Sequence, residues 1–426
     1  MAETAPTLPP AREIPAAFTA SLRSWWHVGE KQSAISEERL LRRLPFFRSS
    51  SQPQLASEPV VATSSRVQLT NPAHYINTFS IKSTSPAPNA PPPAVVLHGY
   101  GAGLGFFFHN FPPLADWAAR RGTSVFALDW LGMGRSARVP FTIKAKRTDL
   151  RGRVAEAESF FIDSLEEWRN KMQLSKMTLI GHSLGAYFSI AYALKYPDRV
   201  HKLILLSPAG IPRGPNYSEP SRELTDDASS VSSSPKLTSK ENREQSSFHR
   251  ASQGRVQEVR QEQKEKKERE SRTRRLFTYL WEEGWSPFQL VRSTVFWGPM
   301  LIGKYSTRRF STLTPEETRD MHDYIMNITL AKGSGEYCIS HILEPGAHAR
   351  LPMVDRIAAL PKDMQVTFVY GDHDWMDPVG GQESVRQLKK AGNPNAKMYI
   401  ISNAGHHVYL DNKDAVNEMM VKALDR

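Results

Sequence analysis

Short apolar runs alternate with amphipathic stretches along much of the chain. Apolar runs bounded by turn residues are typical of strands buried on both faces, and apolar residues at intervals of three and four are typical of helices. This alternation predicts βαβ units and a mostly parallel sheet, an α/β fold. The predicted strands are an opening hairpin, 66–69 with 75–81, followed by 94–97, 124–128, 177–180, 202–206, 365–370 and 396–401. The predicted helices are 116–121, 155–172, 184–196, 382–391 and 414–424.

Three segments depart from this pattern. Residues 1–65 carry few strand or helix signals and are expected to be weakly structured. Residues 214–275 are rich in Ser, Glu, Lys and Arg, which cannot bury enough apolar surface to offset the entropy of ordering, so a disordered insert is predicted. Residues 276–360 are aromatic-rich and helical, which predicts a cap over the sheet. The two parts of the hydrolase-like core are then 66–213 and 361–426.

The N-terminal segment contains one predicted helix, over 36–44, which Pro45 ends. Its apolar residues Leu40, Leu41 and Leu44 sit among Arg42 and Arg43, which fits either an amphipathic helix lying on a membrane or a helix docked on the core. The segment lacks the apolar region of a secretory signal. Glu3 and Glu13 count against a mitochondrial transit peptide, and the sequence leaves open whether residues 1–30 form one.

The charge balance favours anionic partners. The chain of 426 residues has 55 Lys and Arg against 44 Asp and Glu, a net charge of +11, with a mean hydropathy of -0.46. Such a balance suits nucleic acid or an anionic lipid surface. Acidic residues interleave the most basic run, 261–275, so we expect no nucleic-acid partner. The single cysteine, Cys338, excludes an intramolecular disulfide, a structural zinc site built on cysteines and a CxxC motif.

The strongest chemical signal is Gly181-His182-Ser183-Leu184-Gly185, a GxSxG motif between a predicted strand and a predicted helix. This context is that of a nucleophile elbow, a sharp turn that exposes a serine at the carboxyl edge of the sheet. The glycines are needed because side chains there would collide with neighbouring backbone. Ser183 is therefore the predicted nucleophile.

A serine hydroxyl needs a base to take its proton and an acid to orient that base. In hydrolases of this type the chain order is serine, acid, histidine. Asp374, in the loop after strand 365–370, is the predicted acid, with Asp377 as the alternative. His406, in the loop after the last strand, is the predicted base, with His407 as the alternative.

An acyl-transfer site also needs backbone donors for the developing oxyanion. The N–H of Leu184, which follows the nucleophile, is one predicted donor. The other is the N–H of Tyr100, in the glycine-rich loop 98–103 after strand 94–97. That loop has the spacing GxGxG, not the GxGxxG of a dinucleotide-binding turn, and no helix start follows it at once.

Beyond the shared hydrolase motifs, the chain resembles a lipid-handling branch of the α/β-hydrolase family. That branch includes the lipid-droplet co-activator of triglyceride lipase, the N-acylphosphatidylethanolamine lipase and fungal mitochondrial cardiolipin-specific deacylases. The resemblance covers 66–213 and 276–426. Its motifs are LHGYGAG (97–103), LDWLGMGRS (128–136), GHSLGAY (181–187), LWEEGWSPFQLVR (280–292), WGP (297–299), SGEYCISHILEPGAHARLPMVDRI (334–357), GDHDWMD (371–377) and GHHVYLD (405–411).

The resemblance implies a serine phospholipase that cleaves an acyl ester of an anionic glycerophospholipid, with cardiolipin deacylation as the leading case. It implies a peripheral enzyme at the mitochondrial inner membrane, or else one in the cytoplasm or on lipid droplets. No metal or organic cofactor is expected. Two alternatives are an acyl-CoA-dependent lysophosphatidic acid acyltransferase and a non-enzymatic lipase co-activator. The co-activator lacks the nucleophilic serine that this chain has at Ser183.

The branch also carries an HxxxxD motif associated with acyl transfer. Here the motif runs from His406 to Asp411. Asp411 has a second interpretation, because Asp411 or Asn412 precedes the last helix and can cap its free N–H groups. We expect the capping role for Asp411.

Overall fold

The computed structural model describes residues 8–49, 58–214 and 272–426. Its centre is an eight-stranded sheet with the order β1-β2-β4-β3-β5-β6-β7-β8. The first hairpin is antiparallel, β2 joins β4 antiparallel, and every later pairing is parallel. The strands are β1 Val60–Gln68, β2 Tyr75–Ser83, β3 Ala94–Leu97, β4 Ser124–Leu128, β5 Met177–His182, β6 Val200–Leu206, β7 Gln365–Gly371 and β8 Ala396–Ile401. The predicted α/β fold is confirmed.

Helices cover both faces of the sheet. On one side α4 (Leu150–Lys171), α5 (Leu184–Lys195) and α12 (Pro378–Lys390) pack on it, and on the other α3 (Phe111–Arg121) and α14 (Lys413–Asp425) do. The strand residues alternate accordingly. In β3, Val95 and Leu97 join the first core cluster, and Ala94 and Val96 join the second. This double burial explains the continuous apolar runs that predicted the strands.

Three helices, α3, α4 and α12, begin four or five residues earlier than the sequence pattern indicated. The helix α3 begins at Phe111, five residues before the predicted start, with prolines in its first turn. Proline fits the first turn because its missing N–H would have no partner there in any case. The helix α12 begins at Pro378 and carries a glycine pair that weakens its helical signal.

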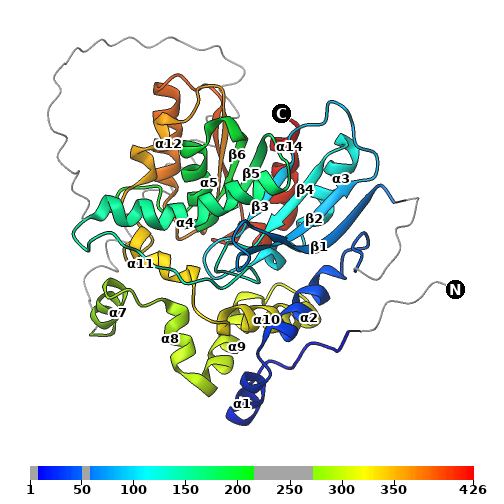
Figure 1. Cartoon of the computed structure of the whole chain (residues 1–426), viewed down its shortest axis with the longest axis vertical. Coiled ribbons are helices and arrows are strands. Elements are labelled where there is room, and N and C mark those ends of the chain that lie inside the picture. Colours follow the sequence, from blue (N-terminus) through cyan, green and yellow to red (C-terminus); the bar gives the residue numbers. More distant parts are fainter. Residues whose placement is uncertain (1–7, 50–57, 215–271) are drawn as a thin grey trace.

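A helical cap lies over the carboxyl ends of the parallel strands (Figure 1). It consists of α7 (Arg272–Glu282), α8 (Pro287–Ser293), α9 (Gly298–Arg309), α10 (Pro315–Leu330) and the short α11 (Ile339–Ile342). Phe288 of α8 stacks on Tyr100, with ring centroids 5.0 Å apart, so the cap touches the loop after β3. The predicted disordered insert falls almost wholly on 215–271, outside the described residues, and its last four residues begin α7.

The expectation of a weakly structured N-terminal segment is wrong for its described part. Helices α1 (Phe18–Trp26) and α2 (Glu30–Leu41) form there, and β1 begins at Val60. Leu40 and Leu41 of α2 are fully buried, so this helix docks on the core and does not lie on a membrane.

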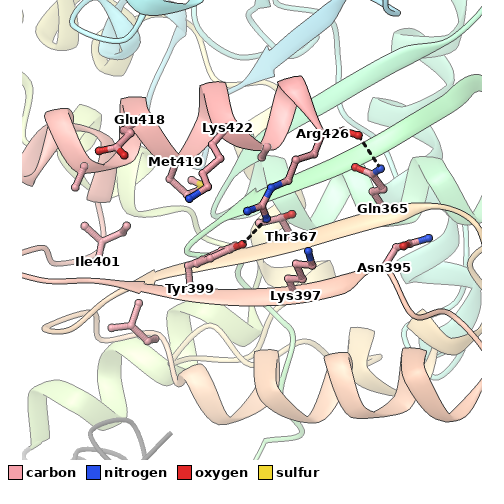
Figure 2. A pocket seen from close by; sticks show the side chains of 13 residues that line it. Gln365, Thr367, Asn395, Lys397, Tyr399, Ile401, Glu418, Met419, Lys422 and Arg426 are labelled. Atoms are coloured by element: carbon pink, nitrogen blue, oxygen red, sulfur yellow. Dashed lines mark hydrogen bonds between the residues drawn. The ribbon is translucent and has the colours of Figure 1, made fainter. Parts of the chain in front are cut away.

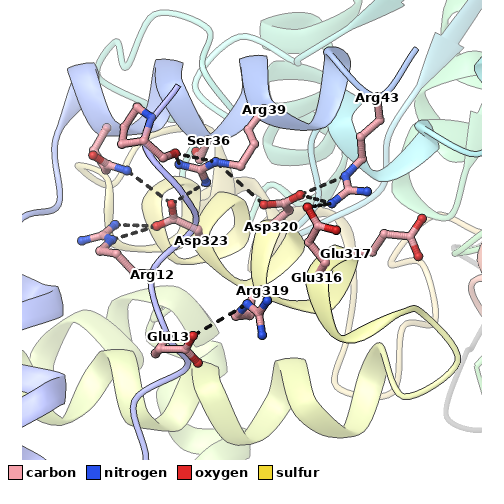
Figure 3. Close-up of polar contacts among 12 residues, drawn as sticks. Arg12, Glu13, Ser36, Arg39, Arg43, Glu316, Glu317, Arg319, Asp320 and Asp323 are labelled. Carbon is pink, nitrogen blue, oxygen red and sulfur yellow. Dashed lines mark hydrogen bonds and ion pairs between the residues drawn. The ribbon is translucent and has the colours of Figure 1, made fainter. Parts of the chain in front are cut away.

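Charge pairs fasten the N-terminal segment to the cap (Figure 3). The fully buried carboxylate of Asp323, on α10, accepts hydrogen bonds from Arg12 at 2.6 Å and from Arg39 at 2.9 Å. Arg43 pairs with Asp320 one turn earlier on α10, at 2.5 Å. Arginines are common in solvated segments, so their spacing gave no sign of buried acceptors on a helix 277 to 311 residues away.

None of the helices within the three described ranges combines the length and the hydrophobicity needed to cross a bilayer.

Candidate active site

Ser183 sits in a sharp turn between β5 and α5. Its backbone has φ 52° and ψ −117°, a conformation that non-glycine residues rarely adopt, which is characteristic of a nucleophile elbow. A side chain on Gly185 would come within 2.5 Å of the carbonyl oxygens of Leu97 and His98, and one on Gly181 within 2.6 Å of the carbonyl oxygen of Gly185. The two glycines let the turn pack against β3, and Ser183 projects at the carboxyl edge of the sheet.

Three residues that are distant in the sequence meet at this edge. The Nε2 atom of His406 lies 3.0 Å from Ser183 Oγ, and its Nδ1 atom lies 3.1 Å from Asp374 Oδ1. His406 follows β8, Asp374 follows β7, and these strands are parallel neighbours, so their carboxyl ends meet. Asp374 has no exposed side-chain surface, and Oδ1 is also held by the Met376 amide at 2.9 Å. The geometry is that of a nucleophile, a base and an orienting acid.

The two alternative residues lie elsewhere. Asp377 is the N-cap of α12 and accepts a hydrogen bond from the Val379 amide at 2.9 Å. The Nδ1 atom of His407 accepts a hydrogen bond from Arg309 Nε at 3.2 Å. Burial, and then the Arg309 charge, hold the pKa of His407 well below its ordinary value, so His407 is neutral. The structure thus brings Asp374 and His406, not Asp377 and His407, to Ser183.

The predicted oxyanion donors border the nucleophile. Leu184 is the first residue of α5, so its N–H has no carbonyl partner within the helix. The loop after β3 reaches Ser183 at Gly99, where an added Cβ would lie 2.9 Å from Ser183 Cβ. Tyr100 follows directly, and the cap covers its ring through Phe288. This placement is compatible with the N–H groups of Leu184 and Tyr100 as donors, and their role stays a prediction.

The structure adds residues that the sequence did not single out. His182, inside the GxSxG motif, places Nε2 3.0 Å from the carbonyl oxygen of His406. Trp375 lies beside His406, with ring centroids 4.9 Å apart, and is 56% exposed. In the loop after β3, the His98 ring accepts a hydrogen bond from the Trp130 amide at 3.1 Å. The available signal for the first two residues was their place in the chain, since His182 directly precedes Ser183 and Trp375 directly follows Asp374.

The expected capping role of Asp411 is wrong. The last helix, α14, is capped by Asn412, whose side chain accepts a hydrogen bond from the Ala415 amide at 3.3 Å. Asp411 instead ends the short α13 (Val408–Asp411). Its Oδ2 accepts a hydrogen bond from the Gly405 amide at 3.0 Å, and its Oδ1 accepts one from Arg309 Nη1 at 2.9 Å. Both interactions bear on the loop that carries His406, and Asp374, not Asp411, is the carboxylate bonded to the His406 ring.

A groove of about 290 Å³ lies away from these residues, between α14 and the edge strand β8 (Figure 2). Tyr399, Met419 and Lys422 line it, and Arg426 donates a hydrogen bond to the Tyr399 hydroxyl at 3.0 Å. None of the predicted catalytic residues lines this groove. No cluster of three His, Cys, Asp or Glu residues suited to a metal ion occurs within the part of the chain that the structure describes.

Comparison with known proteins agrees with this geometry. A family model described as the alpha/beta hydrolase fold matches residues 92–413. The chain is 33% identical to the 1-acylglycerol-3-phosphate O-acyltransferase of Arabidopsis thaliana, over 80% of this chain and 68% of that protein. It is 29% identical to the human (lyso)-N-acylphosphatidylethanolamine lipase, over 80% of this chain and 82% of that protein.

Among solved structures, the carboxylesterase CesB of Bacillus subtilis has a TM-score of 0.50 with 13% sequence identity, covering 93% of this chain and 98% of that one. At that identity the likeness concerns the fold alone. The strand order, the serine turn and the family match together show that the chain belongs to the α/β-hydrolase family, in the lipid-handling branch that includes acylglycerophosphate acyltransferases and N-acylphosphatidylethanolamine lipases.

Proposed function

We propose that this protein is a serine hydrolase that cleaves an acyl ester of a glycerophospholipid. The observation that carries the proposal is the continuous hydrogen-bonded line from Ser183 Oγ through the His406 ring to Asp374 Oδ1. A serine in an elbow turn with this support is equipped to attack a carbonyl carbon. The names of its relatives point to glycerophospholipids as the substrate class.

In this mechanism Ser183 Oγ attacks the acyl carbonyl while His406 Nε2 takes the hydroxyl proton. Asp374 accepts the Nδ1–H of His406, which fixes the ring tautomer and stabilises the imidazolium that forms. The N–H groups of Leu184 and Tyr100 stabilise the negative charge on the carbonyl oxygen. His406 then gives its proton to the departing glycerol oxygen, and a water activated by the same ring hydrolyses the acyl-enzyme.

Acyl transfer to lysophosphatidic acid is the second candidate, because relatives named as acylglycerophosphate acyltransferases are 32% and 33% identical to this chain. The same Ser183 and His406 serve if a lipid hydroxyl replaces water at the second step. The position of Asp411 gives no separate support, because this carboxylate contacts Gly405 and Arg309 and not the His406 ring.

The membrane is the proposed source of the substrate. Exposed apolar side chains gather on α1 and on the neighbouring segment 295–305 of the cap, and Phe18 packs on Trp297 with ring centroids 4.8 Å apart. Trp26 is 76% exposed. Together with the net charge of +11, this surface suits a peripheral contact with anionic lipid. Cardiolipin as the substrate and the mitochondrial inner membrane as the location remain part of the proposal.

The test is a lipid panel with purified wild-type and Ser183→Ala protein. Vesicles contain cardiolipin, phosphatidic acid, phosphatidylethanolamine or N-acylphosphatidylethanolamine, and free fatty acid and lysolipid are measured by mass spectrometry. A parallel assay supplies lysophosphatidic acid and labelled acyl-CoA. We expect Ser183-dependent release of fatty acid, highest with cardiolipin. Transfer of the label to lysophosphatidic acid without hydrolysis would establish the acyltransferase, and hydrolysis that survives Ser183→Ala would refute the serine mechanism.

A further inference from the structure

Arg309 connects the cap to the loop that carries His406. It is the last residue of the cap helix α9, and its guanidinium reaches two side chains of the histidine loop. Its Nη1 donates to Asp411 Oδ1 at 2.9 Å, and its Nε donates to His407 Nδ1 at 3.2 Å. The two charged side chains are about four-fifths buried, with 19% and 20% exposure, so solvent screens their attraction only in part.

Asp411 transmits this contact to the main chain. One carboxylate oxygen holds the guanidinium, and the other accepts the N–H of Gly405 at 3.0 Å. Gly405 directly precedes His406, and His407 directly follows it. The residues on both sides of the catalytic base are therefore tied, one through Asp411 and one directly, to the same guanidinium.

We propose that Arg309 and Asp411 act as a positioning pair for His406: they fix the main-chain path of 405–407 so that His406 Nε2 meets Ser183 Oγ. This inference rests on the proposed serine mechanism and extends it. It makes the cap part of the catalytic apparatus, because α9 supplies one member of the pair. On the same helix Leu301 and Tyr305 are exposed, at 41% and 37%.

A direct role for Arg309 in binding a substrate phosphate fits the geometry less well. The Asp411 carboxylate already balances its charge, and its Nε and Nη1 are engaged with the histidine loop. Its remaining Nη2 is buried, and within the described residues it has no hydrogen-bond partner. Arg309 lines neither the small cavity beside Gly101 and Phe288 nor the cavity that Asp411 lines.

The experiment compares Arg309→Gln, Asp411→Asn and the double variant with Arg308→Gln, a matched control whose arginine is exposed and next in the chain. Three rates are measured per folded molecule: labelling of Ser183 by a fluorophosphonate, hydrolysis of p-nitrophenyl butyrate, and hydrolysis of phospholipid vesicles. The first two use small neutral compounds without a phosphate headgroup to bind. Thermal melting and circular dichroism establish the folded fraction.

For Arg309→Gln and Asp411→Asn we expect the labelling rate and the kcat for both substrates to fall by the same factor. This factor should be about 10²-fold, because misplacement of a catalytic group has an effect of that size. KM should stay within about threefold of the wild-type value. The double variant should be no worse than the more severe single variant, because both break one unit. Arg308→Gln should match the wild type.

Two outcomes would overturn the proposal. One is a rise in KM for phospholipid with unchanged labelling, which would make Arg309 a headgroup-binding residue. The other is wild-type labelling per folded molecule, which would leave the pair a purely stabilising role. If Arg309→Gln does not fold, Arg309→Lys replaces it, because a lysine ammonium reaches only one of the two acceptors, Asp411 and His407. Labelling of this variant at the wild-type rate would also refute the proposal. Failure of the serine mechanism is seen separately, as wild-type protein that is not labelled at Ser183.

Discussion

The ring of His182 donates a hydrogen bond to the main-chain carbonyl oxygen of His406, with 3.0 Å between Nε2 and the oxygen. A carbonyl oxygen only accepts, so the proton of this buried imidazole resides on Nε2. Burial, and then the neighbouring His406, hold the pKa of His182 well below its ordinary value, which keeps the ring neutral. The residue before the nucleophile thus fixes the loop of the base, and a neutral ring there adds no charge to compete with the imidazolium that His406 forms.

His182→Ala should lower kcat about tenfold, because a single buried hydrogen bond contributes roughly 0.5–1.5 kcal/mol. His182→Gln, which keeps an N–H donor, should lose less. Steady-state hydrolysis of p-nitrophenyl butyrate measures both. Equal activity of all three proteins would show that the bond does not bear on catalysis.

Asp374→Asn should lower kcat by orders of magnitude, roughly 10⁴-fold as in a known triad, because the amide favours the wrong imidazole tautomer. Asp377→Asn is the matched control. Asn also caps helices well, so α12 should keep its cap and the enzyme should keep its activity. The measurement is kcat of the two purified variants at equal folded concentration. A larger loss in Asp377→Asn would move the role of the acid to that residue.

Asn412→Ala should lower the free energy of unfolding by about 1 kcal/mol, since it removes the side chain that caps α14. Hydrolysis per folded molecule should not change. Chemical denaturation and a labelling assay give the two quantities. Because Asp411 does not cap this helix, Asp411→Asn should show the opposite pattern, with loss of activity out of proportion to loss of stability.

The ion pairs of Asp323 with Arg12 and Arg39 should be important for folding. Removal of the carboxylate by Asp323→Asn leaves Arg12 without this buried partner and Arg39 with only the more distant carboxylate of Asp320, 3.8 Å away. This change should lower the free energy of unfolding by about 3–5 kcal/mol. Glu38→Gln is the control on α2, because the Glu38–Arg42 pair is partly exposed and should contribute at most about 1 kcal/mol. Urea unfolding of the two variants measures both losses, and equal losses would contradict this role of the Asp323 ion pairs.

The described part of residues 1–30, which the sequence left open as a transit peptide, also contacts the cap. Arg12 holds Asp323, and Ser21 donates a hydrogen bond to the carbonyl oxygen of Phe296 at 2.5 Å. A chain that lacks residues 1–26 should therefore melt at a lower temperature than one that lacks residues 1–7. Identical melting would show that α1 adds nothing to the stability of the cap.

Acid should destabilise the protein in part through His322. Burial lowers the pKa of His322 to about 4, with Asp323 opposing this shift and Arg12 adding to it. An unfolded histidine titrates near 6.5, so between pH 6.5 and about 4 the unfolded chain binds more protons, and stability falls as the pH falls. This residue should account for about 2 kcal/mol between pH 7 and pH 5.

The measurement for His322 is urea unfolding of wild-type and His322→Gln protein at both pH values. The variant should lose less stability than the wild type on going from pH 7 to pH 5. His98, His182 and His407 are buried with lowered pKa values too, so some acid sensitivity should remain in the variant. An unchanged difference between the two pH values would contradict the shift at His322.

Sequence pattern alone predicted the local elements with good fidelity. The strands 94–97, 124–128 and 396–401 have the predicted bounds. The first two are short, largely buried apolar runs that turn residues delimit. The elbow at Ser183 was equally readable, since its two glycines and its place between strand and helix are local requirements. The order of serine, aspartate and histidine followed from the motifs after each strand.

The tertiary structure decided which of several similar residues has which role. Asp374 and Asp377 are three residues apart, yet one faces His406 and the other caps a helix, because the turn after β7 directs them to different neighbours. The same holds for His406 and His407, and for Asp411 and Asn412. The anchoring of the N-terminal helices and the reach of Arg309 to the histidine loop join segments about 100 to 310 residues apart. Sequence periodicity records which face of an element is buried, but the partner of a charged side chain depends on where distant elements pack, and only the folded chain fixes that.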